Sequence, residues 1–293
     1  MRILLFGASG QVGTEFLSLA ASEGVEVVAP DRGALDLTDQ RAVAGLIAGN
    51  SWSAVVNAAA YTDVDRAESD EAFALAVNGK APDQLAIETG RLGIPLIHIS
   101  TDYVFDGRKA APYVEQDLPA PLNAYGRSKL AGERGVTASN PRHVILRTSW
   151  VYSPYGRNFV RTILRLARER DRLTIVADQR GCPTAARDVA RACLTIALRC
   201  ASNPEGGPYG LYHYAGAGAA TWFELAKTIV NLAHLSSPVE VVPIRTYEYP
   251  TPAVRPADTR LDCAAVLQRF DIKPRPWQEA LEETLSRLCQ RMP

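Results

Sequence analysis

The stretch Gly7-Ala8-Ser9-Gly10-Gln11-Val12-Gly13 decides the fold class because of what lies on either side of it. Residues 3–6 form an apolar run that is typical of a buried strand, and residues 12–21 have the pattern of a helix. Glycines between a strand and a helix permit a sharp turn and close approach of a pyrophosphate, which the helix N-terminus attracts. The spacing is G-x-x-G-x-x-G, not the commoner G-x-G-x-x-G, so the strand–loop–helix context carries the prediction of a dinucleotide site.

Apolar runs and helical stretches continue to alternate beyond this loop. Further strands are predicted at 25–29, 54–57, 95–99 and 144–146, and helices at 40–48 and about 71–92. Strands without polar alternation, separated by helices, indicate a parallel sheet covered on both faces, the doubly wound α/β (Rossmann) class. We therefore expect a dinucleotide-binding domain over 1–150. Residues 151–293, which prolines punctuate, are expected to form mainly a smaller ligand-binding lobe, with some segments returning to the main sheet.

Acidic residues follow the second predicted strand, where the adenosine end of a dinucleotide would lie. Asp31 comes 18 residues after Gly13, near the spacing at which a carboxylate reaches the ribose hydroxyls. The neighbouring Arg32 would instead attract a 2′-phosphate, so NADH and NADPH both stay open as cofactors. Asp36 and Leu37 belong to a segment that either caps the next helix or approaches the adenine.

A tyrosine and a lysine four residues apart form the predicted catalytic pair. Residues at this spacing share a helix face, so Tyr125 and Lys129 are expected to be neighbours. A nearby ammonium would lower the tyrosine pKa, and the phenol would then protonate a carbonyl oxygen while hydride reaches the carbon. Thr101 ends the fourth predicted strand, at the same edge as the glycine loop, and is expected to orient that carbonyl.

The composition excludes several other classes of protein. Lys plus Arg and Asp plus Glu each total 32, so the basic excess typical of nucleic-acid binding is missing. The five cysteines form no C-x-x-C pair, which favours buried, reduced thiols over a disulfide scaffold or zinc site. No apolar stretch approaches the roughly 20 residues that span a bilayer. The sequence therefore predicts a cytoplasmic protein without a nucleic-acid or membrane partner.

Several longer motifs resemble one family. They are LLFGASGQVG at 4–13, VVNAAAYTDVDRAES at 55–69, HISTDYVFDG at 98–107, PLNAYGRSKLAGE at 121–133, RTSWVY at 147–152, DQRGCPT at 178–184, GLYHYAG at 210–216 and YPTPAVRP at 249–256. The chain resembles the extended short-chain dehydrogenase/reductase superfamily and, within it, the dTDP-4-dehydrorhamnose reductases. The resemblance extends from residue 1 to about 280, and its later motifs are more specific than the glycine loop.

The resemblance implies a role for each matching residue. It implies Tyr125, Lys129 and Thr101 as the catalytic set. For cofactor binding it implies Gly10, Gln11, Val12, Asp31, Ala59, Ala60, Thr62, Tyr125 and Lys129, to which the loop and the segment after the second strand add Gly7, Gly13, Asp36 and Leu37. The substrate-binding positions would be Thr101, Asp102, Trp150 and Arg255. A guanidinium at Arg255 suits a diphosphate or a sugar, although a surface arginine in a loop is the alternative.

One family feature does not carry over to this chain. Some relatives are dimers bridged by magnesium through glutamates, and Glu15 matches one of these ligands. Arg187, however, stands where another acid is expected, and an arginine cannot ligate a cation. The sequence therefore predicts no metal, while a homodimer stays open.

The predicted function is NAD(P)H-dependent reduction of the C4 ketone of dTDP-4-dehydro-L-rhamnose to dTDP-L-rhamnose, a step of cell-surface polysaccharide synthesis. One alternative is a reductase or epimerase of another nucleotide sugar, because the sequence does not show which sugar face meets the cofactor. The other is a catalytically silent regulatory subunit of the same fold, against which the intact Tyr125, Lys129 and Thr101 speak.

Overall fold

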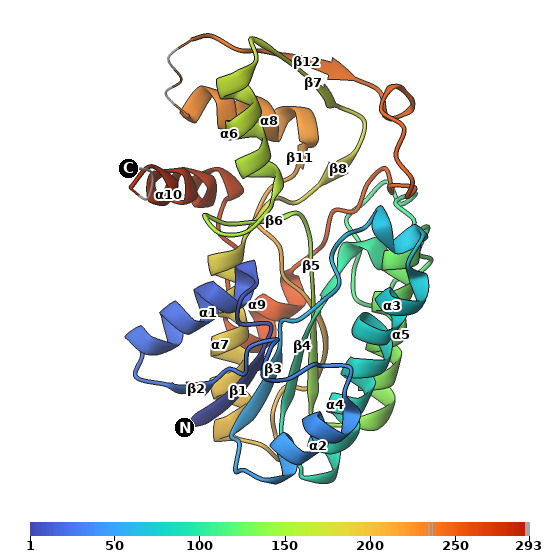
Figure 1. Ribbon diagram of the computed structural model, residues 1–293, viewed down its shortest axis with the longest axis vertical. Helices are drawn as coiled ribbons and strands as arrows, with labels where there is room; N and C mark the ends of the chain where they lie inside the picture. The colour runs from blue at the N-terminus through green and yellow to red at the C-terminus, as the bar shows by residue number, and fades with distance from the viewer. Residues whose placement is uncertain (234, 236, 291–293) are drawn as a thin grey trace.

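A six-stranded parallel sheet forms the centre of the larger part of the molecule (Figure 1). The computed structural model describes residues 1–233, 235 and 237–290. The strand order is β10-β5-β4-β3-β1-β2: β2 lies on one side of β1 and the later strands are added on the other side, as in doubly wound proteins. The strands are β1 (Arg2–Phe6), β2 (Glu26–Val28), β3 (Ala54–Asn57), β4 (Leu96–Thr101), β5 (His143–Thr148) and β10 (Gly210–His213).

Helices cover both faces of this sheet, as the apolar runs predict. One face packs against α1 (Gln11–Ser22) and α7 (Ala186–Ser202). The other face is covered by α2 (Gln40–Ala48), α4 (Ala81–Arg91) and α5 (Ala124–Ser139). The central strand β3 is buried along its whole length, and apolar residues of both helix layers complete the two cores. The predicted doubly wound class is confirmed.

The stretch predicted as one helix over 71–92 consists of three consecutive helical segments. They are α3 (Glu71–Leu75), the π-helical η2 (Ala76–Lys80) and α4. Within η2, the Asn78 side chain is buried, accepts the Tyr61 N–H at 2.8 Å and donates to the Tyr61 carbonyl at 2.9 Å. The π turn thus fixes the loop that follows β3, and π turns are often found at functional sites.

The second half of the chain contributes to both parts of the molecule. β10 pairs with β5 at the edge of the main sheet, and α7 and α9 (Ala264–Phe270) pack beside it. The smaller lobe has its own core, formed by α6 (Phe159–Glu169), α8 (Trp222–Leu232) and α10 (Trp277–Cys289). Its strands are short: β6 (Val151–Tyr152), β7 (Arg172–Val176), β8 (Arg180–Gly181), β9 (Thr184–Ala185), β11 (Ala220–Thr221) and β12 (Glu240–Ile244).

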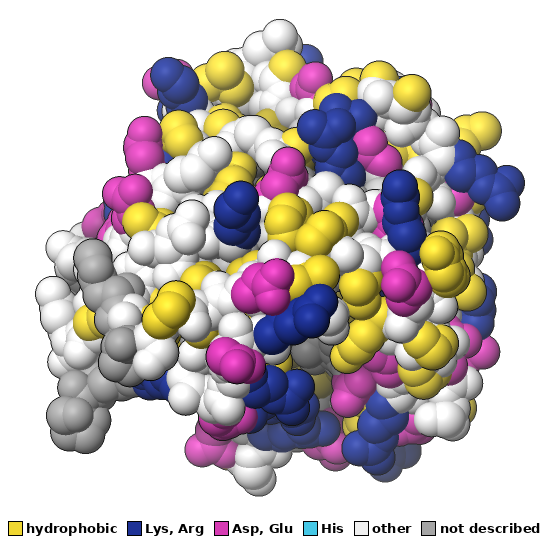
Figure 2. Space-filling model, turned by 90° about the horizontal axis from the view of Figure 1, so that it is seen from above, with side chains coloured by type: hydrophobic (Ala, Val, Ile, Leu, Met, Phe, Trp, Pro, Cys, Tyr) yellow, Lys and Arg dark blue, Asp and Glu magenta, His cyan; other side chains and the backbone are white. Residues whose placement is uncertain are grey.

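The surface and the cysteines bear on the sequence predictions. On the face shown in Figure 2, the described residues place cationic and anionic side chains among apolar and neutral ones, without an extended basic stripe.

All five cysteines are free. Cys182, Cys193 and Cys200 are buried, as predicted. Cys263 is half-buried and Cys289 is exposed, so the prediction of buried thiols is wrong for these two. Among the described helices, none is long and apolar enough to cross a membrane.

Candidate active site

The phosphate loop turns from β1 into α1 in a conformation that glycine favours. Gly7 has φ of +83°, and a Cβ at this position would lie 2.4 Å from the backbone nitrogen of Ala59. The Gly10 N–H donates to the Gly7 carbonyl at 3.0 Å, and Gly10 is the N-cap of α1. Because glycine has no capping side chain, the first N–H groups of α1 are left for an anion. The loop therefore fits a pyrophosphate group.

The acids after β2 are held by local turns. Asp31 is exposed and accepts the Ala34 N–H at 2.8 Å. Asp36 accepts both the N–H and the hydroxyl of Thr38 at 2.8 Å, and these bonds lower the pKa of Asp36. The N-terminus of α2 is capped by Asp39 instead, so Asp36 is not the helix cap. Leu37 packs against the core beneath.

The loop after β3 lies against the phosphate loop. Ala59 donates its N–H to Asn57 Oδ1 at 3.1 Å and is the backbone that excludes a side chain at Gly7. Ala60 and Thr62 follow in the same segment. Their small side chains leave room for a flat ligand at the carboxyl edge of the sheet, where ligands of such folds bind.

Tyr125 and Thr101 come together because α5 packs directly on the backbone. Asn123 caps α5 by accepting the Gly126 N–H at 2.8 Å. A Cβ on Gly126 would lie 2.2 Å from the Tyr103 carbonyl oxygen, so the helix is in contact with the turn η3 (Asp102–Val104). This contact brings Tyr125 beside the end of β4, where its hydroxyl interacts with that of Thr101.

The protonation of the predicted pair differs from the expectation. Burial raises the pKa of Tyr125 to about 12, and the bond with Thr101 offsets this only in part. Lys129 donates its Nζ–H to the Ile99 carbonyl at 2.7 Å, and burial lowers its own pKa to about 8, although Glu133 opposes this. The expectation that Lys129 lowers the Tyr125 pKa is wrong for this arrangement, because desolvation dominates.

Asp102 lies at the inner end of the candidate site and is buried. It accepts the Thr101 hydroxyl at 3.1 Å on Oδ1 and the Thr259 hydroxyl at 2.5 Å on Oδ2. Burial raises the pKa of Asp102 to about 7, while these hydrogen bonds act in the opposite direction. The sequence reasoning missed Thr259, which follows the proline-rich motif and carries no signal of its own.

Trp150 and Arg255 are both held by other side chains. Trp150 has φ of +47°, a strained value of the kind that concentrates at functional sites, and its ring stacks on Trp222 with centroids 3.5 Å apart. Arg255 is mostly buried and forms a bidentate ion pair with Asp65, with one N–O distance of 2.7 Å. It also donates to the hydroxyl of Tyr103. Arg255 is therefore not a free surface arginine.

Glu15 is buried among arginines from two other helices. Arg187 of α7 lies 3.2 Å from its Oε2, and Arg287 of α10 lies 2.8 Å from its Oε1 and 3.1 Å from its Oε2. Oε1 forms this ion pair and no hydrogen bond with the described residues. Glu15 thus has cationic side chains as its partners.

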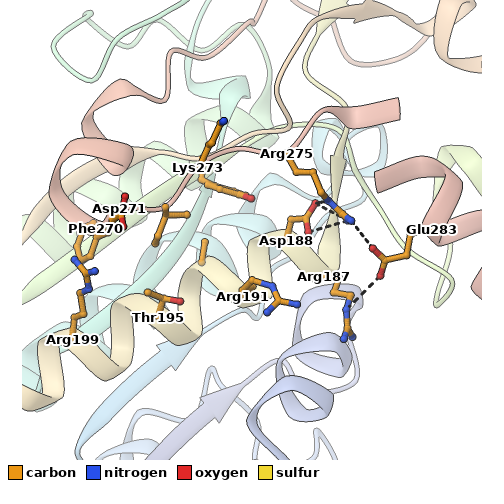
Figure 3. Close-up of a pocket in the computed structure, with 13 residues that line it drawn as sticks. Arg187, Asp188, Arg191, Thr195, Arg199, Phe270, Asp271, Lys273, Arg275 and Glu283 are labelled. Carbon is orange, nitrogen blue, oxygen red and sulfur yellow. Dashed lines mark hydrogen bonds and ion pairs between the residues drawn. The ribbon is translucent and has the colours of Figure 1, made fainter. Parts of the chain in front are cut away.

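A cavity of about 360 Å³ lies apart from these residues, between α7, the segment 270–275 and α10 (Figure 3). Arg275 pairs there with Asp188 at 3.1 Å and with Glu283 at 2.6 Å, whereas Lys273 points away from them. Among the described residues that line it, none belongs to the predicted site. The cavity is therefore separate from the candidate active site.

The fold and the site together define a class of protein. A doubly wound sheet with a glycine phosphate loop, and a tyrosine and lysine on the helix after β4, is the arrangement of extended short-chain dehydrogenases/reductases. The family model described as RmlD substrate binding domain matches residues 1–290. The chain belongs to this family, that of the dTDP-4-dehydrorhamnose reductases.

Individual relatives agree along the whole chain. A dTDP-4-dehydrorhamnose reductase of Sinorhizobium fredii is 44% identical over 96% of this chain and 95% of its own. The crystal structure of such a reductase from Clostridium acetobutylicum has a TM-score of 0.91 and 36% identity, covering 99% of this chain and all of that one. A Bacillus anthracis enzyme in complex with NADP has a TM-score of 0.91 and 34% identity, with 98% and 99% covered.

Proposed function

We propose that this protein reduces the C4 ketone of dTDP-4-dehydro-L-rhamnose to dTDP-L-rhamnose with NADPH or NADH. The observation that carries the proposal is the meeting of Tyr125 and Thr101 at the carboxyl edge of a sheet whose first loop fits a pyrophosphate. The relative from S. fredii is named for this activity and matches nearly the whole chain.

The protonation of Tyr125 suits a reduction. A bound nicotinamide cofactor would supply the hydride that reaches the sugar C4. With its pKa raised to about 12, Tyr125 is a neutral phenol throughout the physiological range and has a proton to donate to the developing alkoxide. Thr101 orients the ketone, and its bond to Tyr125 places both hydroxyls at one oxygen.

Lys129 has a position from which to hold the cofactor. Its ammonium is buried and donates a hydrogen bond to the Ile99 carbonyl on β4. We assign it to the nicotinamide ribose hydroxyls. The remaining cofactor contacts are assigned to the phosphate loop (Gly7, Gly10, Gln11, Val12, Gly13), to Asp31, Asp36 and Leu37, and to Ala59, Ala60 and Thr62.

The sugar nucleotide is assigned to residues from both halves of the chain. Asp102 follows Thr101 directly, Trp150 lies at the end of β5, and Arg255 comes from the segment after β12. Arg255 already donates to Asp65, to the Ala253 carbonyl and to Tyr103, so it would bind a diphosphate through the donors that these contacts leave or by exchanging one of them. In this division of labour, 1–150 binds the dinucleotide and 151–293 contributes most of the substrate lobe.

Two alternatives are separable from this proposal. A reductase or epimerase of another nucleotide sugar would share the fold and the Tyr125–Lys129 pair. A catalytically silent subunit would bind cofactor without turnover. Size-exclusion chromatography with light scattering measures directly whether the protein is a homodimer.

The test is oxidation of NADPH and NADH by the purified protein with dTDP-4-dehydro-L-rhamnose, followed by NMR of the product. We expect stoichiometric cofactor oxidation and a product with the L-rhamno configuration at C4. A product with the opposite C4 configuration would mean that the protein makes a different nucleotide sugar, which is the first of the two alternatives. A folded protein that binds NADPH but gives no turnover would exclude this substrate.

A further inference from the structure

A chain of buried hydrogen bonds leads away from the candidate proton donor. The Tyr125 hydroxyl interacts with that of Thr101, Thr101 donates to Asp102 Oδ1 at 3.1 Å, and Thr259 donates to Asp102 Oδ2 at 2.5 Å. Thr101, Asp102 and Thr259 are each at most 6% exposed. These hydrogen bonds join the end of β4 to a segment more than 150 residues later in the sequence.

Each end of this chain is fixed by the backbone. The Thr101 oxygen accepts the Tyr103 N–H at 3.1 Å, which leaves one further lone pair for Tyr125. The Thr259 N–H donates to the Arg180 carbonyl at 2.9 Å, and the Thr259 side chain is 1% exposed. Thr259 is therefore a positioning residue that holds Asp102 in line with Thr101.

Asp102 is the group in this chain that gains and loses a proton near neutrality. Burial brings its pKa to about 7. The titratable groups that face it are Tyr103, Tyr125 and Cys182, and burial raises the pKa of each, to about 12 for Tyr125 and about 11 for Cys182. All three are neutral at pH 7, so none of them competes with Asp102 as a proton source.

We propose that Asp102, held by Thr259, stores the proton that restores Tyr125 after each reduction and passes it through the hydroxyl of Thr101. The inference rests on the proposed reduction, because only a reaction that consumes a proton needs such a store. When Asp102 is protonated its O–H donates to Thr101 and Thr101 donates toward Tyr125, whereas the carboxylate reverses this direction.

The proton balance closes over one turnover. The Tyr125 O–H bond breaks as the proton moves to the sugar oxygen. The Thr101 O–H bond breaks as that of Tyr125 reforms, and the Asp102 O–H bond breaks as that of Thr101 reforms. The Asp102 carboxylate then takes a proton from solvent before the next turnover, which replaces the one proton that reduction consumes.

The test is the pH profile of kcat with dTDP-4-dehydro-L-rhamnose and saturating NADPH for the wild type, Thr259→Val, Thr259→Ser and Asp102→Asn. The wild-type kcat should fall as pH rises through about 7, because Asp102 is then deprotonated and has no proton to pass to Tyr125. Thr259→Val removes a donor that favours the carboxylate, so the limb should move upward by about one pH unit. At pH values above about 7, the kcat of this variant should then exceed that of the wild type. Structural damage would lower kcat and could not produce this result.

Two further variants complete the design. Thr259→Ser keeps the hydroxyl and should keep the wild-type limb. Thr284→Val removes a buried threonine hydroxyl from α10, far from this chain, and should leave the profile unchanged. Asp102→Asn cannot titrate, so its first turnover should oxidise one equivalent of NADPH rapidly before a slow, pH-independent steady state.

The outcomes separate this inference from the function on which it rests. If the fall of kcat with pH occurs at the same pH in Thr259→Val as in the wild type, Asp102 is not the proton store. The same holds if Asp102→Asn still shows this fall. Either result would leave the reductase assignment intact. A wild type that binds NADPH but does not reduce the ketone at any pH would overturn both.

Discussion

At the scale of single residues, Tyr125 is the proposed proton donor. Because burial keeps it a neutral phenol, Tyr125→Phe removes the transferable proton without removing a charge. We expect kcat to fall at least about 100-fold, the usual scale for loss of an acid–base group, while NADPH affinity is kept. Steady-state kinetics and fluorescence titration of NADPH measure the two quantities.

A matched control is Tyr209→Phe, which removes a hydroxyl that donates to the Pro204 carbonyl at 2.8 Å in a loop before β10. It should keep the wild-type kcat. A Tyr125→Phe protein that retains more than a tenth of the wild-type kcat would assign the proton donor elsewhere.

Local rules were enough to propose some residues of the candidate site from the sequence. Helical spacing joins Tyr125 to Lys129, and the end of an apolar run identifies Thr101. The sequence could not predict that Lys129 binds the Ile99 carbonyl, or that Thr259 binds Asp102, because these contacts depend on how distant segments pack. Nor could it predict the Tyr125 pKa, since desolvation depends on the whole fold.

At the scale of elements, one buried ion pair joins β4, β5 and α5. Arg147 donates to both oxygens of Glu133, at 2.8 and 2.6 Å, and Ser100 donates to the same carboxylate at 2.5 Å. We expect Arg147→Met to lower the free energy of unfolding by about 3–5 kcal/mol, because it leaves a buried carboxylate without its cation. Urea unfolding followed by circular dichroism measures this.

The double variant Glu133→Gln with Arg147→Met tests that reason. It removes both charges, so it should be more stable than Arg147→Met alone. Equal stability of the single and double variants would mean that lost packing, and not the unpaired carboxylate, causes the destabilisation.

Of the first five strands, β1, β3, β4 and β5 were predictable because each contains an apolar run buried between two helix layers, whereas β2 is a short, partly exposed edge strand. The strand β10 was not predictable: it is four residues long, follows Pro208 and gains its place only by pairing with β5. Prolines and glycines around α7 likewise concealed a helix that packs across the main sheet. Tertiary pairing, which no local pattern encodes, decided these elements.

For the whole molecule, Glu15 links the helix of the phosphate loop to the smaller lobe. Arg287→Met removes a partner from a carboxylate that is fully buried. We expect a loss of about 1–3 kcal/mol in the free energy of unfolding, the range for a buried polar group left unsatisfied. The control Arg165→Met breaks an exposed pair with Glu169 and should cost less than about 0.5 kcal/mol. Equal losses in the two variants would contradict a structural role for Glu15.

Buried histidines predict how stability depends on pH. Burial lowers the pKa of His98, His143 and His213, to about 3 for His213. The unfolded chain takes up protons near pH 6.5 while the folded chain does not, so stability is complete above about 6.5 and falls as pH decreases. Each histidine contributes at most about 1.4 kcal/mol per pH unit. Urea unfolding between pH 7.5 and 5 should give a smaller slope for His213→Gln, and an unchanged slope would contradict this account.

The contact between α5 and the turn after β4 leaves no space for an atom between Gly126 and the Tyr103 carbonyl. The distance between the proposed proton donor, Tyr125, and the hydroxyl of Thr101 is therefore set by the backbone, which point mutations change least. A lineage that acquires a new sugar must do so by varying the loops above the sheet, because moving the helix would abolish the reaction first. A glycine that takes no part in the chemistry thus restricts the paths along which the specificity of this enzyme can evolve.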